Sequence, residues 1–235
     1  MWDSDGRGRL VASRGANARP APHVVISVAR DGQTFAIGSA VPDALAAEIE
    51  SAVAGAALSP PDQPPASLAR CQELLAALGP VERQSGPSYL IPPGTAFDSG
   101  ADVRRSDAAD VEAMRDYSAD RRDWSVEEWR LLLDGAYGPW AVALDGARVI
   151  AICHSARLTD RGAEAGVWTD PGYRGRGHAS AVTAAWASLP ALAGRRLFYS
   201  TSAENISSQR VAARLGLRPI GWTWLLHGRQ ATGGA

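Results

Sequence analysis

One segment of the chain has the residue types of an anion-binding loop. Residues 167–179 read VWTDPGYRGRGHA, and they contain the end of a predicted strand, a short turn and the start of a predicted helix. A helix begins with unpaired N–H groups and the positive end of its dipole, so it attracts negative charge. Glycine allows a phosphate to approach the backbone, and Arg174 and Arg176 add positive charge. The segment therefore predicts a binding site for phosphate or pyrophosphate.

Two classes of ligand present such a group, and the sequence separates them. A dinucleotide site of the G-x-G-x-x-G type needs glycine where this chain has Ser180, and an acidic residue about 20 positions later. No Asp or Glu occurs between residues 171 and 203, and the segment lies too near the end of the sequence for a Rossmann half-sheet. The pyrophosphate of coenzyme A is the better match.

Two short signatures resemble those of the GNAT N-acetyltransferase superfamily. The first, Gln/Arg-x-x-Gly-x-Gly/Ala, matches RGRGHA at residues 174–179. The second is an Asn that opens a helix ending in Leu/Phe-Gly-Phe/Leu, matched by Asn205 and LGL at 215–217. One helix and one strand separate the two signatures, as in the family. The resemblance covers residues 101–228 and implies acetyl-CoA as the acetyl donor and co-substrate.

The resemblance implies a binding role for each matching position. The backbone of Val167, Trp168 and Thr169 is expected to pair with the pantetheine arm, with one N–H facing the thioester oxygen. Asn205 and Ser208 are expected to contact the pantetheine or sulfur end; the alternative for Asn205 is that it only caps its helix. The residues expected to cradle the pyrophosphate, mainly through backbone N–H groups, are Arg174, Gly175, Arg176, Gly177, His178, Ala179 and Ser180. Gly177 is expected to lie against phosphate oxygens with no room for Cβ.

Acetylation of an amine needs the neutral amine, so a general base is expected. Glu164 is the candidate, because it lies on the strand that leads to residues 167–179 and several family members have a glutamate on this strand. The alternative is a surface carboxylate or the partner of an arginine. We expect no metal ligands, because the two cysteines, Cys71 and Cys153, lack partners at metal-ligand spacing.

The general acid of the family is a tyrosine seven residues after the Asn, and this chain departs from that pattern. The position is Ala212, which leaves the acid unassigned. Tyr199, Ser200 and Ser202 are near in sequence, but none is singled out. A thiol with a pKa of about 8.5 also leaves tolerably as a thiolate without an acid.

Hydrophobic periodicity and turn residues predict an α/β fold: a mixed, mostly antiparallel sheet flanked by helices, with an N-terminal α/β subdomain. Strands are expected over residues 23–29, 33–37, 81–91, 102–104, 140–144, 148–156, 163–169, 197–201 and 217–226. Helices are expected over residues 42–53, 68–78, 107–117, 125–133, 177–189 and 206–215.

The expected organisation has three parts. Residues 1–20 lack periodicity and are interpreted as a mobile tail. Residues 21–92 form an N-terminal α/β subdomain of unknown role, and residues 101–228 form the acetyltransferase-like domain. The proline- and glycine-rich stretch 92–100 is the boundary between them.

Composition limits the partners and the compartment. The net charge of −1 attracts neither nucleic acid nor a membrane surface, and no apolar run is long enough to span a bilayer. The sequence start lacks the pattern of a signal peptide, so we expect a cytoplasmic protein. All 24 basic residues are arginines, which together with the frequent Ala, Gly and Pro suggests GC-rich bacterial coding.

The function expected from these observations is N-acetyl transfer from acetyl-CoA to a primary amine of a small molecule or of a protein N-terminus, by direct transfer. One alternative is a non-catalytic acyl-CoA-binding or regulatory module, suggested by Ala212. Another is that residues 21–92 bind a partner. The acceptor is not encoded in a motif, although an acidic cavity would favour polyamine or aminoglycoside substrates. The sequence does not decide whether the chain forms a homodimer.

Overall fold

A computed structural model describes residues 2–14, 18–109, 111–117 and 124–228. Its main sheet is built from β3 (Val24–Ala29), β4 (Gly32–Ile37), β5 (Val81–Ile91), β6 (Asp102–Arg105), β7 (Trp140–Asp145), β8 (Arg148–Leu158), β9 (Gly162–Thr169), β10 (Arg196–Ser200) and β11 (Arg218–Gly228). The order in the sheet is β4-β3-β11-β5-β10-β9-β8-β7-β6. Neighbouring strands within it are antiparallel, except that β9 and β10 are parallel. The predicted α/β class with a mostly antiparallel sheet is confirmed.

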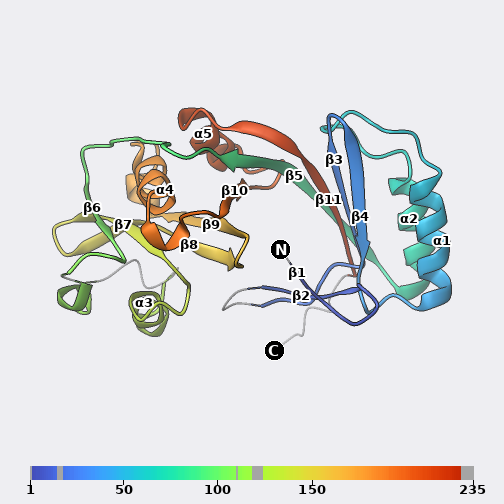
Figure 1. Cartoon of the computed structure of the whole chain (residues 1–235), viewed down its shortest axis with the longest axis horizontal. Helices are drawn as coiled ribbons and strands as arrows, with labels where there is room; N and C mark the ends of the chain where they lie inside the picture. The colour runs from blue at the N-terminus through green and yellow to red at the C-terminus, as the bar shows by residue number, and fades with distance from the viewer. Residues whose placement is uncertain (1, 15–17, 110, 118–123, 229–235) are drawn as a thin grey trace.

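Helices cover different faces in two lobes (Figure 1). The α-helices are α1 (Asp43–Ala54), α2 (Leu68–Leu75), α3 (Val126–Leu133), α4 (His178–Ala187) and α5 (Ile206–Arg214), and the short 3-10 turns are η1 (Ala76–Leu78), η2 (Val111–Met114), η3 (Pro171–Tyr173) and η4 (Pro190–Leu192). In one lobe α1 and α2 pack on β3 and β11, and in the other α4 and α5 lie on one face of the sheet with α3 on the opposite face. The long strands β5 and β11 run through both lobes.

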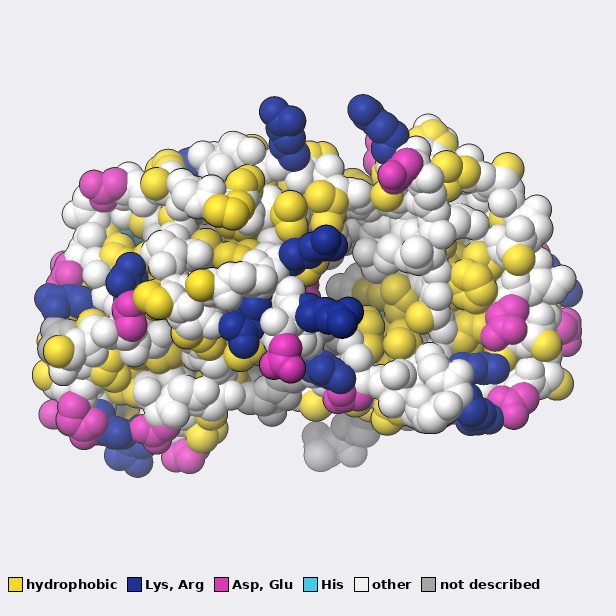
Figure 2. All heavy atoms as spheres, in the orientation of Figure 1, with side chains coloured by type: hydrophobic (Ala, Val, Ile, Leu, Met, Phe, Trp, Pro, Cys, Tyr) yellow, Lys and Arg dark blue, Asp and Glu magenta, His cyan; other side chains and the backbone are white. Residues whose placement is uncertain are grey.

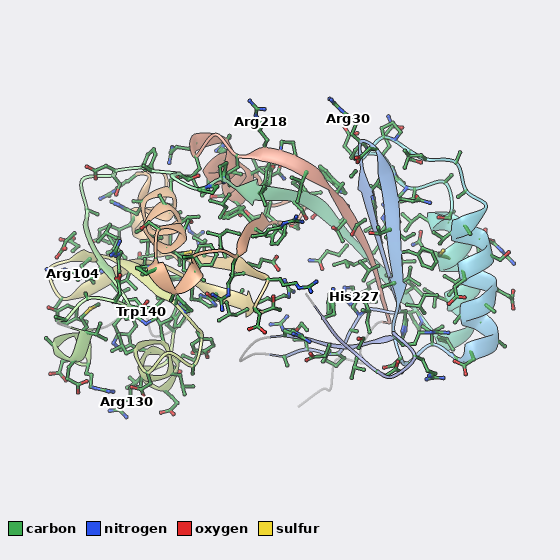
Figure 3. The ribbon with its side chains drawn as sticks, viewed as in Figure 1. Arg30, Arg104, Arg130, Trp140, Arg218 and His227 are labelled. Atoms are coloured by element: carbon green, nitrogen blue, oxygen red, sulfur yellow. The ribbon has the colours of Figure 1, made fainter. Side chains whose placement is uncertain are left out.

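Alternation along the strands explains how one sheet can carry a core on each face. On β7, Ala141 and Ala143 face α4, whereas Trp140 and Val142 face α3. Successive side chains of a strand point to opposite faces, so each strand supplies both cores. Trp140 is almost fully buried at the centre of this lobe (Figure 3).

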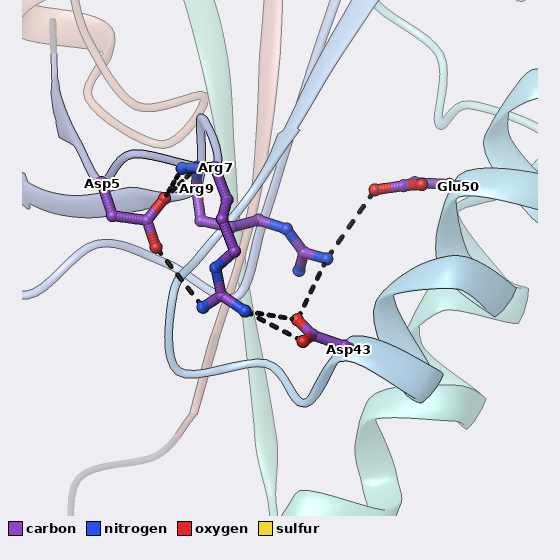
Figure 4. A network of polar contacts seen from close by, with 5 residues as sticks. All are labelled: Asp5, Arg7, Arg9, Asp43 and Glu50. Carbon is purple, nitrogen blue, oxygen red and sulfur yellow. Dashed lines mark hydrogen bonds and ion pairs between the residues drawn. The ribbon is translucent and has the colours of Figure 1, made fainter.

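The N-terminal segment is not the tail that the sequence predicted. Its described residues include a two-stranded hairpin, β1 (Trp2–Ser4) with β2 (Leu10–Ser13). Arg7 of this hairpin donates two hydrogen bonds of 2.9 Å to Asp43 at the start of α1 (Figure 4). Arg9 lies 3.7 Å from Asp43 and 3.9 Å from Glu50. Because short polar strands show little periodicity, the sequence pattern did not predict the hairpin. The ion pairs join segments that are distant in the sequence, so no local pattern predicted them.

Two further expectations need correction. The helix expected over residues 107–117 is only the 3-10 turn η2 in the described part of that range. The expected boundary at residues 92–100 does not divide the sheet, because Trp222–Leu226 of β11 pair with β3 of the N-terminal lobe. The last strand of the predicted acetyltransferase segment thus completes the sheet of both lobes. Within the described residues, no helix is long and apolar enough to cross a membrane.

We expect Trp186→Phe to destabilise the fold. The indole N–H of Trp186 donates to Pro139 O (3.0 Å) and to Ser155 Oγ (3.1 Å), and the side chain is fully buried between α4 and the sheet. Losing that donor and part of the ring should lower the free energy of unfolding in urea by about 2–3 kcal/mol. The exposed Val126→Ala on α3 should change it by less than about 0.5 kcal/mol. Equal effects of the two substitutions would contradict this account.

Candidate active site

The centre of the site is a gap that opens between the two parallel strands. β10 pairs with β9 only from Gly162 to Glu164, and β10 then pairs with β5 on its other side. β9 continues to Thr169, paired throughout with β8. Beyond Glu164, therefore, one edge of β9 has no neighbouring strand in the described structure.

The hydrogen-bonding register between β9 and β8 decides which residues of β9 direct their backbone groups toward this gap. The N–H of Asp170 donates to Ile150 O (2.9 Å), so the even-numbered residues of β9 direct their N–H and C=O groups toward β8. The odd-numbered Val167 and Thr169 direct theirs toward the gap. Of the three residues predicted to pair with a pantetheine arm, Val167 and Thr169 have the geometry to do so. The backbone of Trp168 faces β8 instead.

The strand leads directly into the turn and helix start that the sequence predicts to bind an anion. After η3, the chain reaches Gly177, which has φ +92° and precedes α4. The first intrahelical bond of α4 runs from Ala181 N–H to Gly177 O, so the preceding N–H groups have no acceptor within the helix. These belong to His178, Ala179 and Ser180, as the signature predicts. The Ser180 side chain is fully buried, which leaves its backbone N–H as its contribution.

The structure gives a reason for glycine at position 177 that does not depend on a ligand. Its φ of +92° is rarely adopted by L-residues, and an added Cβ would lie 3.0 Å from the ring of Phe97. That Cβ would point at Phe97 of the linker and toward the Nη1 atom of Arg214, 3.7 Å away. Backbone conformation and packing therefore already require glycine here, and the predicted contact with a phosphate stays a prediction.

Three arginines surround the start of α4. Arg174 donates from Nε to Thr169 O (3.3 Å), and Arg176 donates to Gly172 O (3.3 Å) while its guanidinium lies 5.1 Å from the Tyr173 ring centre. Arg214, in the last turn of α5, is the third and was not predicted. All three are exposed, so they concentrate positive charge where the helix dipole is also positive. The only sequence signal for Arg214 is its place just before the LGL of the second signature.

The β7–β8 hairpin holds the turn before α4 in place. Asp170 is buried and accepts hydrogen bonds from Gly172 N–H (2.8 Å) and from Arg148 (2.6 Å). The Tyr173 hydroxyl donates to Asp145 (2.6 Å), and this hydrogen bond is the main reason that the pKa of Tyr173 is raised. These supporting residues were missed, because nothing in the local sequence links residues 145–148 to the turn.

The linker between the lobes also touches this site. Ser99 Oγ lies 3.1 Å from Nδ1 of His178 at the start of α4. Burial, and to a smaller extent the charge of Arg176, lower the pKa of His178, so the imidazole is neutral near pH 7. His178 therefore adds its backbone N–H and no positive charge to the anion site.

The second signature forms a capped helix. The side chain of Asn205 accepts a hydrogen bond from Ser208 N–H (3.0 Å), so it caps α5, a role that both alternatives for this residue share. Ser208 Oγ lies 2.6 Å from the Tyr199 hydroxyl, and burial raises the pKa of Tyr199 to about 12. Ala212 is fully buried in the core and cannot serve as an acid.

Glu164 lies on the face of the sheet opposite α4. Its carboxylate accepts a hydrogen bond from Arg157 Nη1 (2.5 Å), and its side chain is only 13% exposed. Both residues line a cavity of about 870 Å³ between the lobes, visible as the central hollow in Figure 2. The other walls come from β3, β4, β5, β10 and β11 and from Trp2. The alternative that Glu164 partners an arginine is thus shown, in a position that faces a cavity.

Two neighbouring residues of β8 do not act together. Cys153 is enclosed on the α4 side, where burial raises its pKa. His154 packs on the other face against Trp124 and Tyr137, and burial lowers its pKa to about 4. A Cys-His nucleophile is therefore excluded here. Among the described residues, no group of three or more His, Cys, Asp or Glu side chains could hold a metal ion.

Comparison with known proteins finds one family model and several similar solved structures. The family model described as an acetyltransferase (GNAT) domain matches residues 95–218. A GNAT-family protein of Novosphingobium aromaticivorans is 24% identical to this chain, with a TM-score of 0.44. The match covers 64% of this chain and 66% of the other, so this chain spans just under two thirds of that protein. A GCN5-related N-acetyltransferase-like protein of Streptococcus suis is 19% identical with a TM-score of 0.47, over 89% of this chain and 85% of that chain.

An acetyltransferase of the GNAT family from Colwellia psychrerythraea is 14% identical with a TM-score of 0.48, over 95% of this chain and 83% of that chain. No curated protein matches the chain. The family model covers more than half of the 235 residues and includes β9, the turn after it, α4 and α5. The chain belongs to the GNAT acetyltransferase family.

Proposed function

We propose that the chain transfers the acetyl group of acetyl-CoA to a primary amine by direct attack. The observation that carries this proposal is the gap between β9 and β10. It leads to the arginine-rich start of α4, and Glu164, the last residue of β9 that pairs with β10, lines the cavity between the lobes. A donor held in the gap and an acceptor held in the cavity would meet where the strands part. Membership in an acetyltransferase family supports the reaction class.

Acetyl-CoA would be held mainly by backbone groups. Val167 and Thr169 would pair with the amide groups of the pantetheine arm like a short extra strand. The pyrophosphate would accept hydrogen bonds from the N–H groups at residues 178–180, with charge supplied by Arg174, Arg176 and Arg214. Asn205 and Ser208 would lie toward the sulfur end, in addition to the cap that they form.

The amine would attack from the cavity side. Its nitrogen forms a bond to the carbonyl carbon, and an N–H on the open edge of β9 stabilises the oxyanion of the intermediate. The C–S bond then breaks, coenzyme A leaves as a thiolate, and the proton lost by the amine passes to the Glu164 carboxylate, directly or through water. The products are the amide and coenzyme A, with no further reactant.

The departing thiolate needs no phenol in this scheme. Tyr199 is the tyrosine hydrogen-bonded to α5, but burial raises its pKa to about 12. An acid works best when its pKa is near the operating pH. The substitution at Ala212 is the observation that favours the second candidate, a non-catalytic acyl-CoA-binding module, which would bind acetyl-CoA without acetylating any amine.

We expect charge reversal at the start of α4 to abolish cofactor binding. The double variant Arg174→Glu, Arg176→Glu should weaken acetyl-CoA binding at least about a hundredfold in calorimetry, because two charge-assisted contacts become repulsive. Both residues are exposed, so circular dichroism should be unchanged. Arg130→Glu, on the outside of α3 (Figure 3), is the matched control and should bind normally. Normal binding by the double variant, or no binding by the wild type, would refute the assignment.

Glu164→Gln should lower turnover more than it lowers acetyl-CoA affinity. Loss of a general base typically costs about 10²–10⁴-fold in rate. The measurement is thiol release with a panel of amines from pH 6 to 9, with the exposed Glu127→Gln as control. Wild-type turnover in Glu164→Gln would remove the base from this residue. If the wild type binds acetyl-CoA but acetylates no amine, the non-catalytic candidate is correct.

Tyr199→Phe should leave turnover within about tenfold of wild type, because a phenol with a pKa near 12 is a poor proton donor at neutral pH. Because the pKa of Tyr199 is raised, its neutral phenol is favoured, and Tyr199 stays protonated at every pH below about 12. The pH–rate profile between pH 6 and 9 should therefore be the same in both proteins. Tyr89→Phe, its edge-to-face neighbour, is the control. A loss of more than about a hundredfold, with intact circular dichroism, would show that Tyr199 is the acid.

A further inference from the structure

The cavity beside Glu164 has an unusual distribution of charge. Its lining includes three charged side chains, namely Asp31, Arg157 and Glu164. Asp31 lies at the β3–β4 turn, while Arg157 and Glu164 are adjacent on the neighbouring strands β8 and β9. The remaining lining residues are uncharged and carry hydroxyl, amide, aromatic and aliphatic side chains, apart from glycines. Opposite charges therefore meet at Arg157 and Glu164, and Asp31 is the only other charged residue among the described residues of the lining.

Arg157 is held in position but its hydrogen-bonding capacity is not used up. Nη1 donates to Glu164, and the guanidinium carbon lies 5.5 Å from the ring centre of Trp2. The Nε atom is buried, and no atom in the described part of the chain accepts a hydrogen bond from it. Buried donors in folded proteins are nearly always satisfied, and an orphaned one indicates a site for a water, an ion or a ligand. A guanidinium presents its donors as a planar fork that matches a carboxylate.

We propose that the acceptor is a small amine that also carries a carboxylate, as a free amino acid does. Its carboxylate would bind Arg157 and its amine would lie at Glu164, so that each member of the ion pair exchanges its partner for a charge of the ligand. This inference rests on the proposed acetyl transfer and names its substrate class. The Trp2 ring, on the N-terminal hairpin, would keep the guanidinium in the orientation that receives the carboxylate.

Charge also argues against a polycationic acceptor. Arginine side chains gather around the mouth of the central hollow (Figure 2), since the chain has no lysine and all dark blue groups are therefore arginines. One of the two carboxylates in the cavity is already neutralised by Arg157. A polyamine needs a matching acidic wall, but beyond the Arg157–Glu164 pair the described lining offers only Asp31. A zwitterion adds no net charge to the pair.

The test compares each free amino acid with its own carboxamide, which keeps the amine and the side chain but lacks the carboxylate. Binding of the common amino acids to the protein saturated with coenzyme A is measured by calorimetry, so that no turnover is needed. We expect at least one free acid to bind more than about tenfold tighter than its amide, the loss typical of one charge-assisted contact.

The matched variants are Arg157→Gln and Arg130→Gln. Arg157→Gln should bring the acid-to-amide ratio close to one, whereas Arg130→Gln should leave it at the wild-type value. Arg157→Gln also removes the partner of Glu164, but that effect is common to acid and amide and cancels in the ratio. Circular dichroism confirms the fold of each variant, and the wild-type comparison stands even where Arg157→Gln does not fold.

The outcomes separate this inference from the proposed function. Equal binding of acids and amides, no binding of either, or an unchanged ratio in folded Arg157→Gln overturns the amino-acid assignment. If amines without a carboxylate, such as polyamines or peptide N-termini, are acetylated with equal or higher kcat/KM, acetyl transfer stands and this inference fails. If acetyl-CoA does not bind to the wild type, the proposed function fails independently.

Discussion

The structure depends on the point where β9 and β10 stop pairing. Backbone N–H and C=O groups in a sheet need partners, and beyond Glu164 the open edge of β9 has none from a neighbouring strand. An extended ligand can supply them in the way that a strand would. The same strand then runs into the turn at residues 170–177 and the start of α4, so the edge and the anion site are parts of one continuous segment. Asp170 and the β7–β8 hairpin keep that segment rigid.

The structure also depends on two strands, β5 and β11, that the lobes share. β5 and β11 pair along most of their length, and one end of β11 pairs with β3. α1 and α2 cover only one face of this part of the sheet, so its other face is left to form a cavity wall. Several residues before position 95, which the family model does not cover, therefore lie where an acceptor would be recognised. This separation allows donor binding and acceptor choice to be set by different parts of the chain.

Electrostatics divides the two sides of the sheet in the same way. On the α4 side, positive charge is exposed and suits a pyrophosphate that stays partly in water. On the cavity side, Arg157 and Glu164 are partly buried and compensate each other. Breaking a buried pair is costly unless both members gain new partners, so such a pair selects for ligands that carry both charges.

Most strands and helices could be predicted from the sequence, because alternation, helical periodicity and capping residues such as Ser125 are local signals. The residue types at 167–179 also predicted the anion site, and the position of Glu164 on the strand before them made it the candidate base. The hairpin at residues 2–13, the short η2 in place of a helix, and the roles of Arg214, Phe97 and Arg157 came only from the tertiary structure. Each depends on contacts between distant segments, such as Trp2 with Arg157 or Trp224 with Ile26. Local pattern determines what a segment prefers to form, but which segment it meets is decided by the packing of the whole chain.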